Sequence, residues 1–189
     1  MAGNEQENTM NWKTLSSEYI SKHQYFTARR DRCQRPDGQI VDPYFVVELP
    51  PSVCALAITE NGEVVMTKQF RHPIDKTILE IPGGFIDENE DIQKAIAREL
   101  LEETGYEFSS FDYVGKVAAN PGVLNNYTHL YLAQGGKKIT SQKLDANEDI
   151  EIVLLPLKEV RRMLLQNEFT QALHVCCMFY AFKKLDELK

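Results

Sequence analysis

Several features are scarce or missing in this 189-residue sequence, and each absence narrows the classes of protein to consider. No apolar run approaches the roughly 20 residues of a membrane-spanning helix, so we expect no membrane partner. The N-terminal residues MAGNEQENTMNWK contain no apolar core, so we expect no secretory signal. The four cysteines lack CxxC spacing, which argues against a zinc site and suits reduced thiols in the cytoplasm.

Positive charge is also in short supply, since 21 Lys and Arg stand against 28 Asp and Glu, a net charge of −7. A chain of this sign repels polyanions, so we expect no nucleic-acid partner. An acidic enzyme that acts on phosphate substrates needs metal ions between its own negative charge and that of the substrate. We find no repeats, low-complexity tracts or Ser/Gly-rich linkers, and 43% hydrophobic and 26% charged residues are typical of one globular domain.

Turn signals divide the chain into short strands followed by helices. We expect strands at 25–33 and 39–49, joined by the turn Arg35-Pro36-Asp37-Gly38. Asn61-Gly62 predicts a tight hairpin between strands at 53–60 and 63–70. We expect further strands at 78–81, 111–119, 127–133 and 149–155, and helices at 91–103, 156–167 and 169–187. This order predicts an α/β fold, with a mixed sheet packed between helices.

The expected helix at 91–103 carries an unusual set of charges. Apolar residues recur every four positions, at Ile92, Ile96 and Leu100. Gly105 supplies a C-terminal stop, and Asn89 or Asp87 is the expected N-cap. The strand before this helix ends at Pro82-Gly83-Gly84. The charged residues of interest are Glu99, Glu102 and Glu103. At 100° per residue these three carboxylates share one helix face and repel one another.

Hard divalent cations offset such repulsion, and Mg²⁺ in particular is held by a few carboxylates together with substrate phosphates. We expect Arg98 to point to another side of the helix and to pair with Glu90. Gly83 and its neighbours would let a backbone carbonyl approach the metal, because glycine has no Cβ. The alternative is a solvated charged helix, but Arg98 is the only basic residue from 95 to 115.

The segment 84–106 resembles the Nudix box, G-x5-E-x7-R-E-U-x-E-E-x-G-U, where U is a bulky aliphatic residue. Only Tyr106, an aromatic residue at the last position, departs from the pattern. The matching residues are Gly84, Glu90, Arg98, Glu99, Leu100, Glu102, Glu103 and Gly105. The resemblance implies a Nudix α/β/α sandwich and a pyrophosphohydrolase that uses Mg²⁺, with Mn²⁺ as the alternative. It implies metal ligation by Gly83, Glu99, Glu102 and Glu103.

Flanking segments resemble the ADP-ribose and nucleotide-sugar pyrophosphatase branch of this superfamily. They are Gln69-Phe70-Arg71, the run 80–84, Asn120-Pro121-Gly122 and the acidic segment 147–151. In that branch a proline lies about sixteen residues beyond the last box glycine, the position of Pro121 here, and the acidic loop often supplies the catalytic base. The resemblance therefore implies a substrate-binding role for Arg71, Pro121, Asn125 and Asn126, and catalytic roles for Arg98, Glu102, Glu103 and Glu148.

Glu148 is the expected base and Glu102 the second candidate. One departure concerns the residues after Asn120-Pro121-Gly122, where related enzymes often carry an acidic residue and this chain has Val123-Leu124-Asn125-Asn126. Asparagine orients a substrate but does not hold a metal as a carboxylate does, so the substrate and the route of base catalysis stay open. Among the aromatic residues, Trp12, Tyr25, Phe26 and Tyr44 are stacking candidates for a base, although core packing is the more common role.

The resemblance also implies a division of the chain and a reaction. Residues 1–50 would form an N-terminal antiparallel β extension that dimerises by swapping between two subunits, and 51–189 the Nudix hydrolase domain. The expected reaction cuts the pyrophosphate bond of an ADP-ribose-like nucleotide sugar. The alternatives are hydrolysis of GDP-mannose or another GDP-sugar, of diadenosine polyphosphates or of damaged nucleoside triphosphates, and a non-catalytic nucleotide sensor. A sensor of that kind would need a DNA-reading module, for which no basic segment is left over.

Overall fold

The computed structural model describes residues 10–23, 26–146 and 148–188. The chain forms two compact units, which we describe separately. Unit 1 comprises residues 1–49 and the segment Asn120–Asn126, and unit 2 comprises Pro50–Ala119 and Tyr127–Lys189.

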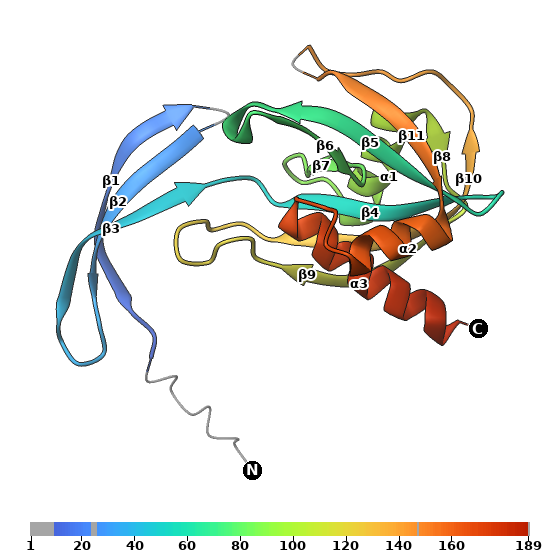
Figure 1. Ribbon diagram of the computed structural model, residues 1–189. Helices are drawn as coiled ribbons and strands as arrows, with labels where there is room; N and C mark the ends of the chain where they lie inside the picture. The colour runs from blue at the N-terminus through green and yellow to red at the C-terminus, as the bar shows by residue number, and fades with distance from the viewer. Residues whose placement is uncertain (1–9, 24–25, 147, 189) are drawn as a thin grey trace. The chain divides into compact units, whose positions relative to one another are not determined.

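Unit 1 contains a three-stranded antiparallel sheet in the order β1-β2-β3 (Figure 1). Its strands are β1 (Lys13–His23), β2 (Phe26–Gln34) and β3 (Ile40–Glu48). The turn between β2 and β3 places Gly38 at a φ of 85°, the left-handed region that favours glycine. Two of these strands were expected, apart from Tyr25, which lies outside the described residues. β1 was missed, because nearly all of its residues are exposed and its sequence has no apolar alternation.

Unit 2 contains an eight-stranded mixed sheet, with the path β11-β5-β4-β10-β8 and β6, β7 and β9 paired to β5, β4 and β10 (Figure 1). The β4–β10 pair is parallel and the other strand pairs are antiparallel. The strands are β4 (Ser52–Thr59), β5 (Glu63–Arg71), β6 (Lys76–Glu80), β7 (Gly83–Phe85), β8 (Tyr106–Glu107), β9 (Ser110–Val117), β10 (Thr128–Lys138) and β11 (Ile150–Pro156). The expected Asn61-Gly62 turn joins β4 to β5, with Gly62 at a φ of 82°.

Helices cover both faces of this sheet, and successive apolar side chains of its central strand β4 point to opposite faces. On β4, every second residue belongs to the core under α2 (Leu157–Leu165) and α3 (Ala172–Glu187), namely Cys54, Leu56 and Ile58. The residues between them pack under α1 (Ile92–Thr104), namely Val53, Ala55 and Ala57. The expected α/β/α sandwich around a mixed sheet is therefore confirmed.

The boundaries of the elements differ from expectation in a few places. Pro82-Gly83-Gly84 was expected only to end the preceding strand, but Gly83–Phe85 forms a further strand, β7, which pairs with β4. β10 extends to Lys138, further than the expected end at residue 133. A short 3-10 helix, His72–Ile74, separates β5 from β6.

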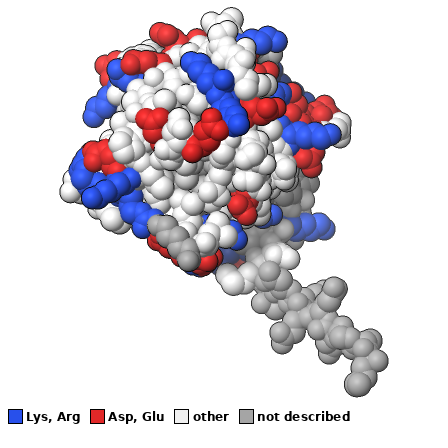
Figure 2. Space-filling model, turned by 90° about the vertical axis from the view of Figure 1, so that its right-hand side faces the viewer, with Lys and Arg blue, Asp and Glu red and all other residues white. Residues whose placement is uncertain are grey.

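Two surface features bear on partners. No helix within the described ranges is long and apolar enough to cross a lipid bilayer. Figure 2 shows Lys and Arg side chains interspersed with Asp and Glu side chains around an uncharged area on one face. A face of mixed sign lacks the uniform positive field that attracts a polyanion.

Candidate active site

The box helix α1 begins at a residue that the sequence did not single out. Asp91 is the N-cap, and its side chain accepts hydrogen bonds from the N–H groups of Gln93 (3.1 Å) and Lys94 (3.0 Å). The expected caps, Asn89 and Asp87, were wrong, since Asn89 lies in the preceding loop at a φ of 64°. A carboxylate at this end also favours the positive pole of the helix.

The other end of α1 is fixed as the sequence predicts. Gly105 has a φ of 73° and its N–H donates to the Leu101 carbonyl at 2.9 Å. A Cβ at Gly105 would also clash with the carbonyl oxygen of Thr140. Glycine is therefore required both by the backbone angle and by the close approach of the 139–143 segment.

Arg98 is the cation at the centre of the carboxylate cluster. It binds Glu90 through Nε (2.9 Å) and a terminal nitrogen (2.9 Å), as the sequence predicts. Its other terminal nitrogen donates to Glu99 (2.9 Å) and Glu102 (3.1 Å). The expectation that Arg98 points away from these glutamates was wrong, because a long arginine on α1 reaches carboxylates one and four positions along the chain. A further bond to the Phe85 carbonyl (3.1 Å) ties the helix to the end of β7.

Glu99 and Glu103 are carboxylates held in a poorly solvated place. Burial raises the pKa of Glu99 to about 7, although the nearby Arg98 lowers it. Burial likewise raises the pKa of Glu103 to about 8, against a hydrogen bond of 2.9 Å that its carboxylate accepts from the Gly83 N–H. The negative charge of Glu148 raises the pKa of both, so all three carboxylates share one electrostatic neighbourhood.

The two glycines before α1 permit this crowding. A Cβ on Gly84 would lie 2.5 Å from the carboxylate carbon of Glu99. A Cβ on Gly83 would lie 2.6 Å from the Cα of Cys54 on β4 and would also clash with the Val53 carbonyl. The backbone at Gly83 and Gly84 therefore passes between strand β4 and the Glu99 carboxylate, and neither position has room for a Cβ atom.

The residues of this cluster fit a divalent cation in type and charge. No three His, Cys, Asp or Glu side chains of the described segments are already arranged around a metal position. Arg98 binds oxygens of Glu99 and Glu102, and the Gly83 N–H donates to Glu103. The carboxylates nevertheless supply hard oxygen donors and more negative charge than Arg98 offsets, which is the chemistry that Mg²⁺ and Mn²⁺ require.

The 139–150 segment brings Glu148 to the cluster, and the sequence did not reveal how. The Lys143 N–H donates to the Glu102 carbonyl at 2.8 Å. The side-chain amide of Gln142 donates to the carbonyls of Glu103 (2.8 Å) and Ile150 (3.0 Å). The last turn of α1 is thereby joined to the start of β11, just after Glu148; Asn147 lies outside the described residues.

Glu148 is partly buried and is held within its own loop. Its carboxylate accepts a hydrogen bond of 3.0 Å from the Asp145 N–H, and its own N–H donates to the Asp145 carbonyl at 3.0 Å. Both bonds fix the backbone around Glu148 next to the box. The geometry is compatible with the expected base, and the catalytic role itself stays a prediction.

Arg71 stands at the end of β5, on the same unit as the box. Its Nε–H donates to Glu80 at 2.8 Å, and its charge lowers the pKa of Glu103, so the guanidinium lies within range of the cluster. Glu80 was read only as part of a motif, and no signal in the sequence marked it as the partner of Arg71.

The other expected substrate residues, Pro121, Asn125 and Asn126, belong to unit 1. The side-chain oxygen of Asn125 accepts the Leu49 N–H at 3.1 Å, so this asparagine links the loop to the end of β3. Pro121 is exposed. Their contact with a substrate stays a prediction.

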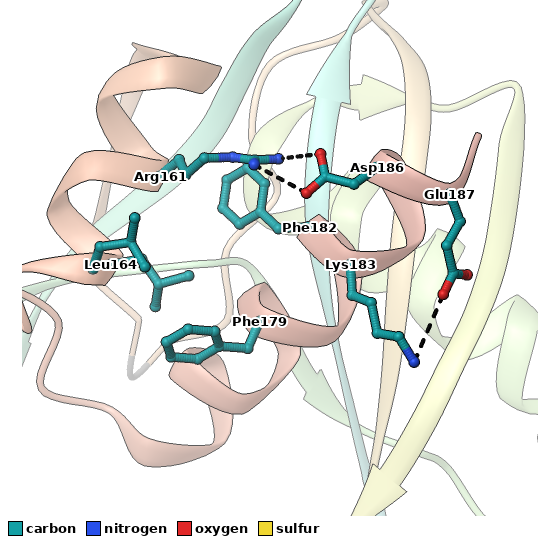
Figure 3. Close-up of a pocket in the computed structure, with 8 residues that line it drawn as sticks. Arg161, Leu164, Phe179, Phe182, Lys183, Asp186 and Glu187 are labelled. Carbon is teal, nitrogen blue, oxygen red and sulfur yellow. Dashed lines mark hydrogen bonds and ion pairs between the residues drawn. The ribbon is translucent and has the colours of Figure 1, made fainter. Parts of the chain in front are cut away.

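A separate cavity of about 450 Å³ lies between α2 and α3 (Figure 3). Its lining residues are Arg161, Leu164, Leu165, Phe179, Phe182, Lys183, Asp186 and Glu187. Its charges pair with one another, Arg161 with Asp186 at 2.7 Å and Lys183 with Glu187 at 3.6 Å. The helices that line this cavity cover the sheet face opposite α1, so the carboxylate cluster is the better candidate for chemistry.

Comparison with known proteins finds matching family models, similar sequences and a similar solved structure. Residues 12–47 match the nucleoside diphosphate sugar hydrolase N-terminal domain, and residues 48–174 match the NUDIX domain. The chain is 35% identical over 148 residues to a methanol dehydrogenase activator of Bacillus methanolicus, covering 78% of this chain and 80% of that protein. It is 29% identical over 166 residues to an ADP-ribose pyrophosphatase of Bacillus subtilis (strain 168), covering 85% and 89%. A crystal structure of an ADP compounds hydrolase superposes with a TM-score of 0.82 at 20% identity, covering 94% and 95%, which supports the fold.

Proposed function

The chain belongs to the Nudix family, and from this premise we propose that it hydrolyses the pyrophosphate bond of a nucleoside diphosphate linked to a sugar. ADP-ribose is the proposed substrate, and a nucleoside monophosphate and a sugar phosphate are the products. The observation that carries the proposal is the cluster of Glu99, Glu103 and Glu148, in which burial and mutual repulsion raise the pKa of Glu99 and Glu103, so that their ionised forms need a nearby cation. The similarity to an ADP-ribose pyrophosphatase supports the choice of substrate.

Magnesium is the proposed cofactor, with manganese as the alternative, and Glu99, Glu102, Glu103 and the Gly83 carbonyl would hold it. When bound, such a cation offsets the negative charge of the diphosphate and favours ionisation of a water molecule. This chemistry addresses the main barrier, which is the repulsion between a charged diphosphate and an incoming nucleophile.

The residues of the chain would divide the remaining work. Glu148 takes a proton from the attacking water, whose oxygen bonds to phosphorus as the bridging P–O bond breaks in line with it. Glu102 is the second candidate for this base. Arg98 keeps the cluster in shape through its bonds to Glu90, Glu99 and Glu102. Arg71 binds a phosphate with its planar set of donors, and Pro121, Asn125 and Asn126 orient the rest of the substrate.

The proposed active species is a homodimer in which the N-terminal β extension, residues 1–50, pairs with the partner subunit. The sheet of unit 1 supports this, since several large apolar side chains on it are more than a third exposed. They are Trp12, Leu15, Tyr19, Ile20, Phe26, Ile40 and Phe45. Light scattering coupled to size exclusion tests the dimer, and a stable monomer at micromolar concentration would refute it. The four free cysteines support a reducing compartment such as the cytoplasm.

The function is tested with a substrate panel. Wild-type protein is assayed for released monophosphate from ADP-ribose, GDP-mannose, other nucleotide sugars, diadenosine polyphosphates and nucleoside triphosphates, with Mg²⁺ or Mn²⁺. We expect nucleotide sugars to be preferred, with ADP-ribose first. A preference for GDP-mannose would change the base and sugar but not the reaction, whereas binding of nucleotides without turnover would favour the sensor.

Two variants separate the cluster from general effects of charge. Replacing Glu103 with Gln should lower kcat by about 10²-fold or more, since several kcal/mol of charge stabilisation depend on this ligand. Replacing Glu107, an exposed glutamate just beyond the helix, with Gln should leave kcat unchanged. Equal kcat values of the two variants would refute the proposed site.

A further inference from the structure

Glu80 is a buried carboxylate outside the box for which the proposed mechanism has no use. Its side chain is 2% exposed, and one of its oxygens accepts the Nε–H of Arg71 at 2.8 Å. Arg71 ends β5 and Glu80 ends β6, two paired strands, so both residues stand on a rigid hairpin.

Stability does not account for this pair. Burial raises the pKa of Glu80, which means that its ionised form is costly in this place. The desolvation of a buried charge commonly exceeds what its ion pair returns, and here the partner is 42% exposed to competing water. A buried charge of this kind is best explained by the geometry that it imposes.

The two terminal nitrogens of the Arg71 guanidinium are not used by Glu80. Only Nε is engaged by Glu80, and within the described residues no acceptor binds the two terminal nitrogens. The charge of Arg71 lowers the pKa of both Glu103 and His174, so the guanidinium is within electrostatic range of both side chains. A guanidinium held by Nε presents its two terminal nitrogens as a fork, which matches two phosphate oxygens.

His174 closes the other side of Glu80. Its Nδ1 lies 3.8 Å from the second Glu80 oxygen and, among the described residues, has no hydrogen-bond partner. Burial, together with the charge of Arg71, lowers the pKa of His174 to about 3, so the ring is neutral at physiological pH. It therefore limits the movement of Glu80 without adding a second cation that would compete with Arg71.

We propose that Glu80 is a positioning residue that fixes Arg71 by its Nε, with His174 behind it, so that the free fork faces the substrate diphosphate beside Glu103. The proposal rests on the proposed function, and it assigns the specificity for a charged diphosphate to the β5–β6 hairpin as well as to the box.

A double-mutant cycle on the full-length protein tests this assignment, with ADP-ribose as substrate. Replacing Arg71 with Ala should raise KM roughly 10- to 100-fold, the range for a lost charged hydrogen bond. Replacing Glu80 with Leu should raise KM about tenfold, with kcat within about threefold of wild type, because the fork is still present but is no longer fixed. In the Arg71→Ala background, Glu80→Leu should add less than about twofold.

A conservative variant and a control accompany the cycle. Glu80→Gln keeps an oxygen that accepts the Nε–H, so its KM should stay within about threefold of wild type. The matched control is Glu60→Leu, which removes an exposed ion pair to Lys137 and should leave KM unchanged. The assignment is overturned if the KM effects of Arg71→Ala and Glu80→Leu multiply, or if Glu80→Leu binds substrate as wild type does.

Guanidinium rescue keeps the test valid even where Glu80→Leu does not fold. Millimolar guanidinium should raise the melting temperature of Arg71→Ala and lower its KM, relative to NaCl of equal ionic strength, because Glu80 offers the vacated anchor. Both effects should be smaller in Arg71→Ala/Glu80→Gln, because the neutral amide oxygen binds a free cation more weakly than a carboxylate does. Neither effect should occur with methylammonium, which lacks the planar fork. Equal responses with and without Glu80 would refute the anchor. A wild type that hydrolyses no nucleotide sugar would instead refute the proposed function, and the melting response would still report on the anchor.

Discussion

Replacing Gly84 with Ala is the most direct perturbation of the carboxylate cluster, because it adds one methyl group at one known place. The new Cβ would lie 2.5 Å from the carboxylate carbon of Glu99 and 2.5 and 2.6 Å from its two oxygens. Non-bonded heavy atoms rest about 3.5–4.0 Å apart, so the carboxylate must move by about 1 Å or more.

The effects on stability and on catalysis should differ, because the displaced atoms are the end of a flexible side chain. Glu99 turns aside by rotation about its own bonds, so the free energy of unfolding should fall by less than about 1 kcal/mol. A catalytic group misplaced by about 1 Å costs roughly 10²-fold in rate, which is about 2.7 kcal/mol of activation free energy. Gly84→Ala should therefore lose kcat and keep its melting temperature.

The neighbouring glycine supplies a matched comparison. A Cβ on Gly83 would lie 2.6 Å from the Cα of Cys54, a backbone atom of a buried strand that does not move aside. Gly83→Ala should therefore lower the free energy of unfolding by about 1–3 kcal/mol, the usual range for overpacking. Steady-state kinetics with ADP-ribose and Mg²⁺, together with thermal denaturation of both variants, gives the comparison. If Gly84→Ala keeps more than half of the wild-type kcat, the position of the Glu99 carboxylate does not control the rate.

Three other predictions follow from the same cluster. Glu148→Gln should reduce kcat by about 10²–10⁴-fold in steady-state assays, and full turnover would move the role of base to Glu102. Because burial raises the pKa of Glu99 to about 7 and of Glu103 to about 8, the folded state binds these protons more tightly than the unfolded state. The metal-free protein should therefore lose stability as the pH rises through these values, and Mg²⁺ should raise the melting temperature more at about pH 8 than at about pH 6; an equal rise would contradict this. Gln142→Glu replaces the two N–H donors of the amide by a carboxylate that faces two carbonyl oxygens. It should cost about 1–3 kcal/mol of stability and lower kcat. An unchanged kcat in a folded variant would show that the position of the 139–150 segment does not affect catalysis.

The sequence predicted the parts of the site that depend on local spacing. Periodicity located α1, and Gly105 marked its end, because a left-handed C-cap has a strong local preference for glycine. The three box glutamates share a helix face whatever the rest of the chain does. The expected pairing of Arg98 with Glu90 is also present in the structure.

The missing parts depend on tertiary contacts between distant segments. The side chain of Gln142 helps to hold the 139–150 segment by donating to two backbone carbonyls, and glutamine has no sequence signature for this role. Likewise, Glu80 and His174 meet across 94 positions of the chain, and neither has a partner at helical or strand spacing. β1 escaped detection because its strand pairing rests on backbone hydrogen bonds rather than on a buried face.

The charge balance of the cluster explains why Arg98 occupies the place that it does. Three glutamates and the Glu148 loop would repel one another in the metal-free protein, and Arg98 offsets part of this by binding Glu99 and Glu102 at 2.9 and 3.1 Å. The proposed cation must therefore displace or share these oxygens, which weakens its binding to the protein alone. Mg²⁺ is commonly held by a few carboxylates together with substrate phosphates, so a site that is only partly open without substrate favours joint binding of the metal and the diphosphate. We therefore expect Arg98 to stabilise the metal-free cluster and to couple binding of the proposed cofactor to binding of the substrate.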